Sequence, residues 1–300
     1  MMAGRVTSAD RPERTRRMEE RNRRMVRAGK LITRSSLAAL TAACLVFAAA
    51  GYAPADAAST FDARYQVRSM GLDLGRARLE LDSSHDGIGS QFRLQSHSLL
   101  GMVDASDTRM RSTVARAGAT LTPQSFTGIY SKDDRVRDIK IGYDADGAID
   151  SYQLAKRDKV RLAEVPQGLG ATTIDPLAAL LQVRAWLSQA PEGASLALHV
   201  FDGRKRYDST VRYLGLTQLK GDAPTAAHRV ALSYVLVAEL DEDTGKLQQT
   251  SEAKERQMEL AVSTDGRFLP LRLDGSLDGL PVSAVLDEDC TGPAGCAAAD

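Results

Sequence analysis

The sequence is poor in the residues that most often carry catalysis, with 4 histidines, 3 cysteines and 1 tryptophan among 300 residues. Neither an H-E-x-x-H nor a G-x-S-x-G sequence occurs, which excludes the common zinc-hydrolase and serine-hydrolase motifs. No two histidines stand at the spacing of a metal-binding pair, and we expect His199 to face solvent or a polar pocket. We therefore predict no catalytic residue, no metal ligand and no cofactor. The four histidines are His85, His97, His199 and His228.

The chain also lacks an excess of either charge, since 39 basic residues balance 39 acidic ones. The first 57 residues hold 11 of the basic and 5 of the acidic residues, which leaves 28 basic and 34 acidic residues and a formal charge of −6. A mildly acidic protein is a poor binder of nucleic acid, because phosphates require basic side chains. It gains nothing from an anionic membrane surface either. We expect neither partner.

One apolar run stands near the N-terminus, at Leu37–Ala50. It follows an arginine-rich segment, has the length of a signal-peptide core, and is too short for a comfortable transmembrane helix. An A-x-A sequence at 55–57 supplies a cleavage site between Ala57 and Ala58. The sequence thus predicts a signal peptide over residues 1–57, a periplasmic protein, and no transmembrane span after cleavage.

Several points about this segment stay open. An uncleaved anchor is the alternative to cleavage. Cys44 offers a weaker alternative as a lipid attachment site, because the apolar run continues past it. The basic extension before the run is unusually long, so translation starts at Met1, Met18 or Met25 are all compatible with the sequence.

Only two cysteines follow the signal peptide, Cys290 and Cys296. The segment between them contains two glycines and a proline, and it can close into a small loop in an oxidising compartment. We predict a structural disulfide that contributes ~2–3 kcal/mol. A metal-binding pair and a redox dithiol are the alternatives, but a metal needs two further ligands and a redox pair usually has the C-x-x-C spacing.

Alternation of apolar and polar residues dominates the chain from residue 61 onward. Similar segments recur between turn-forming clusters, and about a dozen strands are expected. D-G sequences at 202–203 and 265–266 indicate hairpin turns. Gly71 and Gly75 indicate a tight connection between the first two strands rather than a phosphate-binding loop, because no helix follows them.

One segment breaks this alternation. Asp175 and Pro176 are typical of a helix N-cap and a first helical residue, and apolar residues then recur at helical spacing up to Leu187. We expect a mainly β protein: a large curved antiparallel sheet, either a β-spiral or an open barrel, with one amphipathic helix plugging it. No linker is evident, so residues 58–300 are predicted to form a single domain that ends in the small cysteine-closed loop.

Two acidic segments resemble metal sites only superficially. Residues 241–245 have the carboxylate density of a calcium loop but lack the order of its ligands. A solvated hairpin turn is the preferred interpretation there, and also for the two aspartates at 133–134.

Four motifs occur in an order that is similar to one known family. They are Tyr65-x-Val67 with Gly71 and Gly75, D-P-L-x-x-L-L-x-x-R at Asp175–Arg184, V-F-D-G-R-K-R-Y at Val200–Tyr207, and T-D-G-R-F-L-P-L-R-L at Thr264–Leu273. Over Phe61–Leu286 the chain resembles the bacterial envelope proteins catalogued as domain of unknown function 3108. The resemblance implies a periplasmic or secreted location, a β-rich fold and a role in envelope maintenance, and it transfers no catalytic residue. Such a fold is similar in kind to open barrels that carry lipids or acyl chains.

The first functional hypothesis is a non-enzymatic periplasmic protein of envelope maintenance that binds a lipid-like apolar ligand or an envelope protein. Side chains expected to line a cavity for such a ligand are Tyr65, Val67, Leu180, Leu181, Trp186 and Leu187. Ordinary core packing is the alternative for each of them. A second hypothesis is an enzyme acting on an envelope polymer, with Asp175 or Asp202 as acid and base. A third is a scaffold that adds a partner strand at a sheet edge.

Overall fold

The computed structural model of the chain describes residues 60–84, 87–97, 105–118, 120–132, 134–220, 224–250, 254–277, 279–291 and 296. The predicted signal peptide and its cleavage site between Ala57 and Ala58 lie outside these residues. Cys44, His85, Asp133 and the three alternative starts also lie outside them. The predictions made for those positions stay predictions.

The described residues form sixteen strands and one helix, α3 (Pro176–Leu187). The strands before the helix are β1 (Phe61–Ser69), β2 (Leu72–Ser83), β3 (Gly87–Ser96), β4 (Ser106–Ala117), β5 (Thr120–Lys132), β6 (Arg135–Tyr143), β7 (Ile149–Lys156), β8 (Lys159–Leu162) and β9 (Thr173–Ile174). Those after it are β10 (Ser195–Phe201), β11 (Lys205–Leu219), β12 (Thr225–Asp241), β13 (Lys246–Gln249), β14 (Glu255–Ser263), β15 (Pro270–Leu277) and β16 (Leu280–Asp289).

All sixteen strands belong to one sheet. Its order runs from β8 through β7, β6, β5, β4, β3, β2 and β1 to β16, and then through β15, β14, β12, β11 and β10 to β9, with β13 paired to β12. Only β9 and β10 pair in parallel, and the other strand pairs are antiparallel. The end strands β8 and β9 do not pair with each other, so the sheet stays open. This confirms the predicted large antiparallel sheet, with more strands than expected.

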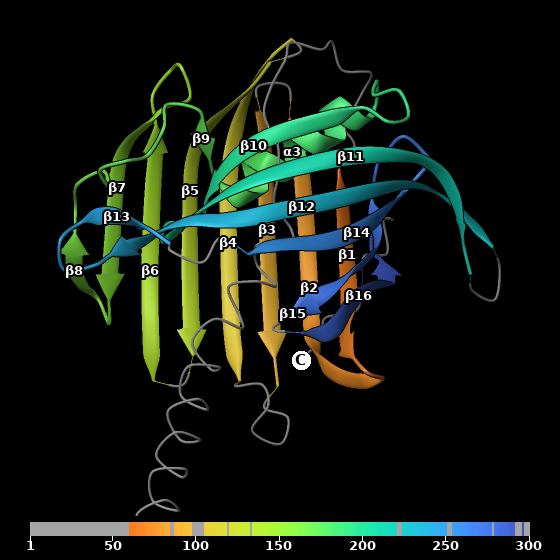
Figure 1. The fold of residues 1–300 in the computed structure, drawn as a ribbon, viewed down its shortest axis with the longest axis horizontal. Helices are drawn as coiled ribbons and strands as arrows, with labels where there is room; N and C mark the ends of the chain where they lie inside the picture. The colour runs from red at the N-terminus through yellow and green to blue at the C-terminus, as the bar shows by residue number, and fades with distance from the viewer. Residues whose placement is uncertain are drawn as a thin grey trace, which may run out of the picture.

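The sheet folds over into two layers. In Figure 1 the strands β1–β7 stand behind, the strands from β10 onward cross in front of them, and α3 lies between the layers near the upper end. We call β1–β8 the first half and β9–β16 the second half. They are continuous with each other through the β1–β16 pairing.

Alternation explains how one sheet surrounds one core. In β1 every second side chain, from Phe61 to Val67, is buried, while the residues between them are partly exposed. The same alternation in β2, β3 and β4 gives the first half one apolar face and one wet face. The apolar faces of both halves and the helix form one core cluster, which contains Phe126 from β5 and Phe201 from β10, both fully buried.

Helix α3 begins where the sequence predicts. The Asp175 side chain caps it, and Pro176 occupies its first turn. Burial extends further around the helix than the predicted apolar stripe, because α3 contacts β3, β4 and β5 on one side and β10 on the other. Even Arg184 is buried, with its guanidinium donating to the backbone carbonyl of Arg267 and stacked over the ring of Phe61.

The first hairpin confirms the predicted tight connection at Gly71, whereas Gly75 lies within β2 rather than in the connection. Met70 and Gly71 both have positive φ and form the turn between β1 and β2. Gly75 lies within β2 at a register shift, with φ of 152°, and a Cβ there would collide with the backbone of Gln95. Gly75 is therefore needed for close packing of neighbouring strands.

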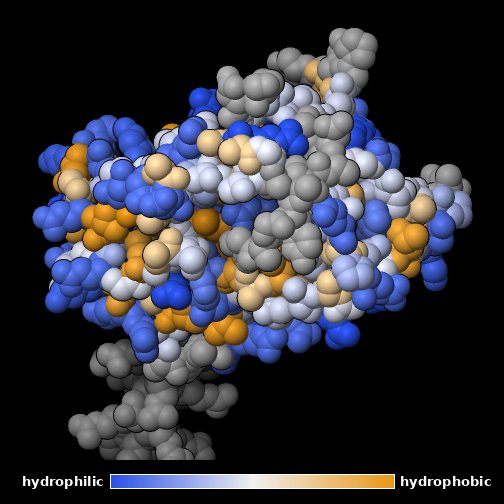
Figure 2. All heavy atoms as spheres, turned by 90° about the horizontal axis from the view of Figure 1, so that it is seen from above, coloured by the Kyte–Doolittle hydropathy of each residue, from blue (hydrophilic) through white to orange (hydrophobic). Residues whose placement is uncertain are grey.

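No helix in the described part of the chain is long and apolar enough to cross a membrane. Seen from above, the surface in Figure 2 is mostly hydrophilic, with apolar groups in separate small patches.

Candidate functional site

A groove of about 1000 Å³ lies on the wet face of β1–β5. Arginines dominate its lining, with six of them against three carboxylates. Residues near the end of β16 and one half of a disulfide close one end of it. The charged lining residues are Arg64, Arg76, Arg78, Arg93, Arg109, Arg111, Glu80, Asp287 and Glu288, and Cys296 lies beside them.

Four of these arginines stand directly opposite one another on four neighbouring strands. Arg64 on β1 pairs in register with Arg78 on β2, which pairs with Arg93 on β3, which pairs with Arg109 on β4. We call these four residues the arginine row. Glu288 on β16 continues the line on one side and Ile129 on β5 on the other.

Such a row has a cost, because like charges directly opposite each other in a sheet repel. Four nearby carboxylates partly offset it: Asp62, Glu80, Asp107 and Glu288, of which Glu80 lies 2.8 Å from Arg78. Asp62 accepts a two-pronged hydrogen bond from Arg78 at 2.9 and 2.6 Å, and Glu288 accepts one from Arg64 at 3.0 Å.

One carboxylate serves two members of the row. Asp107 accepts from Arg93 at 3.2 and 2.9 Å and from Arg109 at 3.1 and 2.7 Å. Partial burial tends to raise the pKa of Asp107, but the two guanidinium groups outweigh it and hold the pKa below its ordinary value. The hydrogen bonds to Asp107 raise the pKa of Arg109. An arginine side chain is always charged in proteins, and the side chains of Arg93 and Arg109 remain 46% and 57% exposed.

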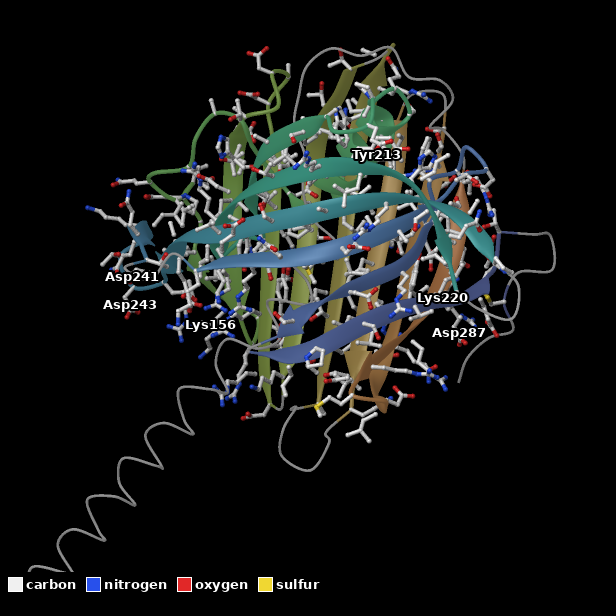
Figure 3. The ribbon with its side chains drawn as sticks, turned by 45° about the vertical axis from the view of Figure 1, so that its right-hand side comes forward. Lys156, Tyr213, Lys220, Asp241, Asp243 and Asp287 are labelled. Atoms are coloured by element: carbon white, nitrogen blue, oxygen red, sulfur yellow. A yellow bond between two sulfur atoms is a disulfide. The ribbon has the colours of Figure 1, made fainter. Side chains whose placement is uncertain are left out.

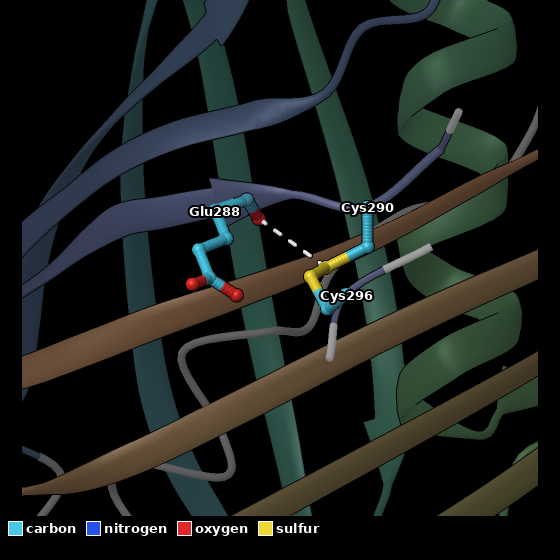
Figure 4. Close-up of side chains that lie close together, drawn as sticks. All are labelled: Glu288, Cys290 and Cys296. Carbon is cyan, nitrogen blue, oxygen red and sulfur yellow. Dashed lines mark hydrogen bonds between the residues drawn. A yellow bond between two sulfur atoms is a disulfide. The ribbon is translucent and has the colours of Figure 1, made fainter. Parts of the chain in front are cut away.

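The predicted disulfide forms beside this groove. Cys290 and Cys296 are joined, and the Cys290 sulfur also lies 4.0 Å from the backbone oxygen of Glu288 (Figure 4). Ligand atoms of these three residues fall within 4.8 Å of one another. Sulfurs bonded to each other are not the thiolates that a metal requires, so this group is a structural link rather than a metal site.

The six residues predicted to line an apolar cavity lie in the core cluster instead. Val67, Leu180, Leu181, Trp186 and Leu187 pack there with exposures between 2% and 7%, and none of them lines the groove. Tyr65 lines the groove, although its side chain is only 7% exposed. Their role in ligand binding stays a prediction.

The two carboxylates of the enzyme hypothesis hold backbone amides. Asp175 accepts from the amides of Leu177 and Ala178, both at 2.9 Å, and Asp202 accepts from those of Arg204 and Lys205 in the β10–β11 turn. Ser112 and Tyr143 also donate to Asp175. Burial raises the pKa of Asp175 to about 6, against these hydrogen bonds, and burial raises the pKa of Asp202 as well. A helix cap and a turn residue account for both side chains without acid–base chemistry.

The remaining polar candidates are also structural. His199 bonds to Asp208 at 2.7 Å on the neighbouring strand, with both side chains partly exposed, as its strand position predicts. Asp241 begins the turn between β12 and β13, where it accepts from the amides of Asp243 and Thr244. Both results agree with the structural roles predicted from the sequence, a strand histidine in polar surroundings and a solvated hairpin turn.

A cluster of ion pairs links the two halves of the sheet. Glu242 lies 3.3 Å from Arg137 of β6 and 3.2 Å from Arg204, and it also pairs with Lys156 of β7. Its side chain is only 13% exposed. Figure 3 shows Lys156 beside the turn that bears Asp241 and Asp243, on the side of the molecule away from Lys220 and Asp287. This cluster ties the β12–β13 turn of the second half to the first half.

The arginine row is the feature that the sequence interpretation missed. Alternation alone places Arg76 and Arg78 on the wet face of β2, and R-x-R recurs at Arg109 and Arg111 of β4. The R-x-R sequence, repeated on β2 and β4, was the pattern that could have indicated an arginine-rich face. Only the strand register aligns these arginines.

Comparison with known proteins identifies the family of the chain. A family model described as "Protein of unknown function (DUF3108)" matches residues 60–279. Among curated proteins none matches the chain. A solved beta-barrel-like protein of domain of unknown function DUF1849 from Brucella abortus is 11% identical and superposes with a TM-score of 0.48, over 77% of this chain and 97% of that one.

Proposed function

Since the chain belongs to the DUF3108 family of proteins of unknown function, we propose its function from the groove itself: a non-enzymatic envelope protein that binds an anionic envelope component on the wet face of β1–β5. The arginine row is the single observation that supports this most. Four guanidinium groups stand opposite one another on neighbouring strands, and their carboxylate partners offset the repulsion only in part, so a bound anion would reduce it further.

The size of the groove fits this role. Pockets for small ligands usually have ~300–1000 Å³, and this groove of about 1000 Å³ lies at the upper end of that range. Fixed arginines on β-strands are also well placed for binding, because rigid elements hold side chains more precisely than loops do. The proposal moves the predicted ligand site from the apolar interior to the outer face.

Location in the periplasm is part of the proposal. The apolar run at Leu37–Ala50, the A-x-A sequence before Ala58 and the disulfide between Cys290 and Cys296 support it. Cell fractionation with N-terminal sequencing tests it. A mature protein that begins at Ala58 is expected, and a cytoplasmic full-length chain would contradict the proposal.

Copurification tests the binding role. The protein and its Arg93→Gln variant are isolated from envelope extracts, and the small molecules that copurify with each protein are analysed by native mass spectrometry. We expect an anionic component with the wild type and its loss from the variant. Arg229→Gln removes the same charge from the exposed face of β12 and should retain it. An equal yield of the component from Arg93→Gln would refute the groove as the binding site.

A further inference from the structure

We propose that the arginine row binds a ligand that carries two or more closely spaced phosphate groups, each bridging guanidinium groups on neighbouring strands. This inference rests on the proposed function and specifies the chemical class of its ligand. The groove binds an extended anion in this account, with the phosphates following the row across β1–β4.

The spacing of the row suits bridging. Neighbouring strands lie ~4.8 Å apart, so the four arginines span roughly 14 Å from β1 to β4. Each guanidinium has five N–H donors in a planar fork, and Asp107 accepts from only two nitrogens of Arg93 and two of Arg109. A phosphate group offers several acceptor oxygens and can accept from two neighbouring arginines at once.

The carboxylates already present favour phosphate over a carboxylate ligand. Asp107 serves both Arg93 and Arg109, and the side chain of Asp62 serves Arg78. A carboxylate ligand would exchange one such partner for an equivalent one. A phosphate monoester carries up to two charges and more acceptor oxygens than a carboxylate. It can therefore add hydrogen bonds to the arginines, whereas a carboxylate ligand only replaces bonds that Asp62 or Asp107 already make.

The local charge attracts such a ligand although the protein as a whole is acidic. The groove lining holds six arginines and three carboxylates, whereas the chain from residue 58 onward has 28 basic and 34 acidic residues. A concave site of one sign concentrates counter-ions more strongly than a flat surface does. The six arginines still outnumber the five carboxylates that line the groove or pair with its arginines, so an anion is favoured there.

Two other phosphate-bearing partners fit the groove less well. Single-stranded nucleic acid binds through aromatic side chains on which bases stack, but Tyr65 and Phe92 in the lining are only 7% and 5% exposed. A bilayer is flat, and its headgroups cannot follow a concave row across four strands. A short, flexible chain of phosphates meets neither obstacle.

Isothermal titration calorimetry of the purified protein with inorganic tripolyphosphate is the test. Orthophosphate, with a single phosphate group, shows how much affinity depends on several linked phosphates. Tricarballylate has three carboxylate groups, matching the three phosphorus atoms of tripolyphosphate. Arg93→Gln and Arg93→Lys probe the row, and Arg229→Gln is the control of equal charge. Circular dichroism confirms that each variant is folded.

Tripolyphosphate should bind at least about tenfold more tightly than either orthophosphate or tricarballylate. Arg93→Gln should weaken it about tenfold or more, Arg93→Lys several-fold, because lysine keeps the charge but loses the fork. Arg229→Gln should bind as the wild type does. Equal binding of tricarballylate, or unchanged binding by Arg93→Gln, would overturn the inference.

Two further probes distinguish a polyphosphate ligand from nucleic acid and from a membrane surface. Binding of single-stranded oligothymidine or of phosphatidylglycerol vesicles that depends on Arg93, without binding of tripolyphosphate, would assign the row to nucleic acid or to a membrane and overturn the inference. If tripolyphosphate fails but copurification still depends on Arg93, the inference falls and the proposed function stands. If tripolyphosphate binds as expected but no envelope component copurifies, only the proposed function falls.

Discussion

The two halves of the sheet differ in how the arginines on their wet faces are paired. In the first half, Arg78, Arg93 and Arg109 face one another, and two of them share a single carboxylate. In the second half, Arg229 has Glu259 to itself, with both hydrogen bonds at 2.7 Å, and Ala261 stands in register between it and the next arginine.

The difference shows that charge content alone does not define a binding surface. In the second half, the pairs Arg229–Glu259 and Arg272–Asp274 follow the usual solution, in which an exposed charge has its own partner and contributes little beyond solubility. The first half keeps four arginines opposite one another on neighbouring strands, an arrangement that costs repulsion. Its inner face, by contrast, is built like that of the second half, and both contribute to one core.

The largest expected effect tests whether the halves share that core. Leu181→Ala in α3 removes a side chain that is 2% exposed, and it should lower the free energy of unfolding by ~3–4 kcal/mol in one transition. Chemical denaturation followed by fluorescence and by circular dichroism measures this. Leu216→Ala, on a leucine that is 69% exposed in β11, is the control and should change stability by less than ~0.5 kcal/mol. Two separate transitions would mean that the halves fold independently.

A second effect is the pH dependence that arises where the halves meet at the start of α3. Because burial raises the pKa of Asp175 to about 6 in the folded protein, from 3.8, the folded state binds its proton more tightly than the unfolded state. Stability should therefore fall by on the order of 3 kcal/mol as pH rises from about 4 to about 6, and stay flat above.

Urea unfolding across this pH range measures the slope, and Asp175→Asn should remove it. Asp107 of the first half has the opposite sign, because its lowered pKa means that stability is lost as pH falls below 3.8. A wild-type protein with no loss of stability between pH 4 and pH 6 would show that Asp175 is ionised without penalty.

Glu242 tests the ionic link between the halves. Glu242→Gln leaves Arg137, Lys156 and Arg204 close together without their carboxylate, and we expect a loss of ~2 kcal/mol, below the ~3–5 kcal/mol of a fully buried pair. The matched variant Glu259→Gln breaks an exposed pair and should cost no more than ~1 kcal/mol. Thermal denaturation compares them, and equal losses would remove any special role for the cluster.

The smallest effect concerns the repulsion within the row. Arg93→Gln removes two opposed like-charge contacts and one pairing with Asp107, so it should change stability by less than ~0.5 kcal/mol, with a gain at low salt that disappears at high salt. Arg229→Gln should instead destabilise by up to ~1 kcal/mol at low salt. Denaturation at two ionic strengths distinguishes them. The same sign for both variants would contradict the contrast between the halves.

Much of the fold could be predicted from local pattern. Asp175, Pro176 and the apolar spacing after them located α3, because cap, proline and periodicity are all short-range signals. Alternation predicted the strands and their wet faces, and the turn at Gly71 followed from its position between two alternating runs. The family resemblance drawn from ordered motifs was confirmed over residues 60–279.

The groove could not be predicted in the same way, because it depends on register. Arg93 faces Arg78 and Arg109 only because β2, β3 and β4 pair as they do, and a shift by one residue would turn each arginine to the other face. For Leu181 or Trp186, sequence gives an apolar character but not whether a neighbour or a cavity lies beside it. Those side chains proved to be packed in the core.

The most direct test of the central claim is nuclear magnetic resonance of the arginine side chains during titration with tripolyphosphate. If the opposed arginines of the first half form the binding site, the Nε–Hε resonances of Arg78, Arg93 and Arg109 shift together and saturate at one concentration, while those of Arg229 and Arg272 stay in place. Equal shifts in both halves, or none in the row, would contradict the claim.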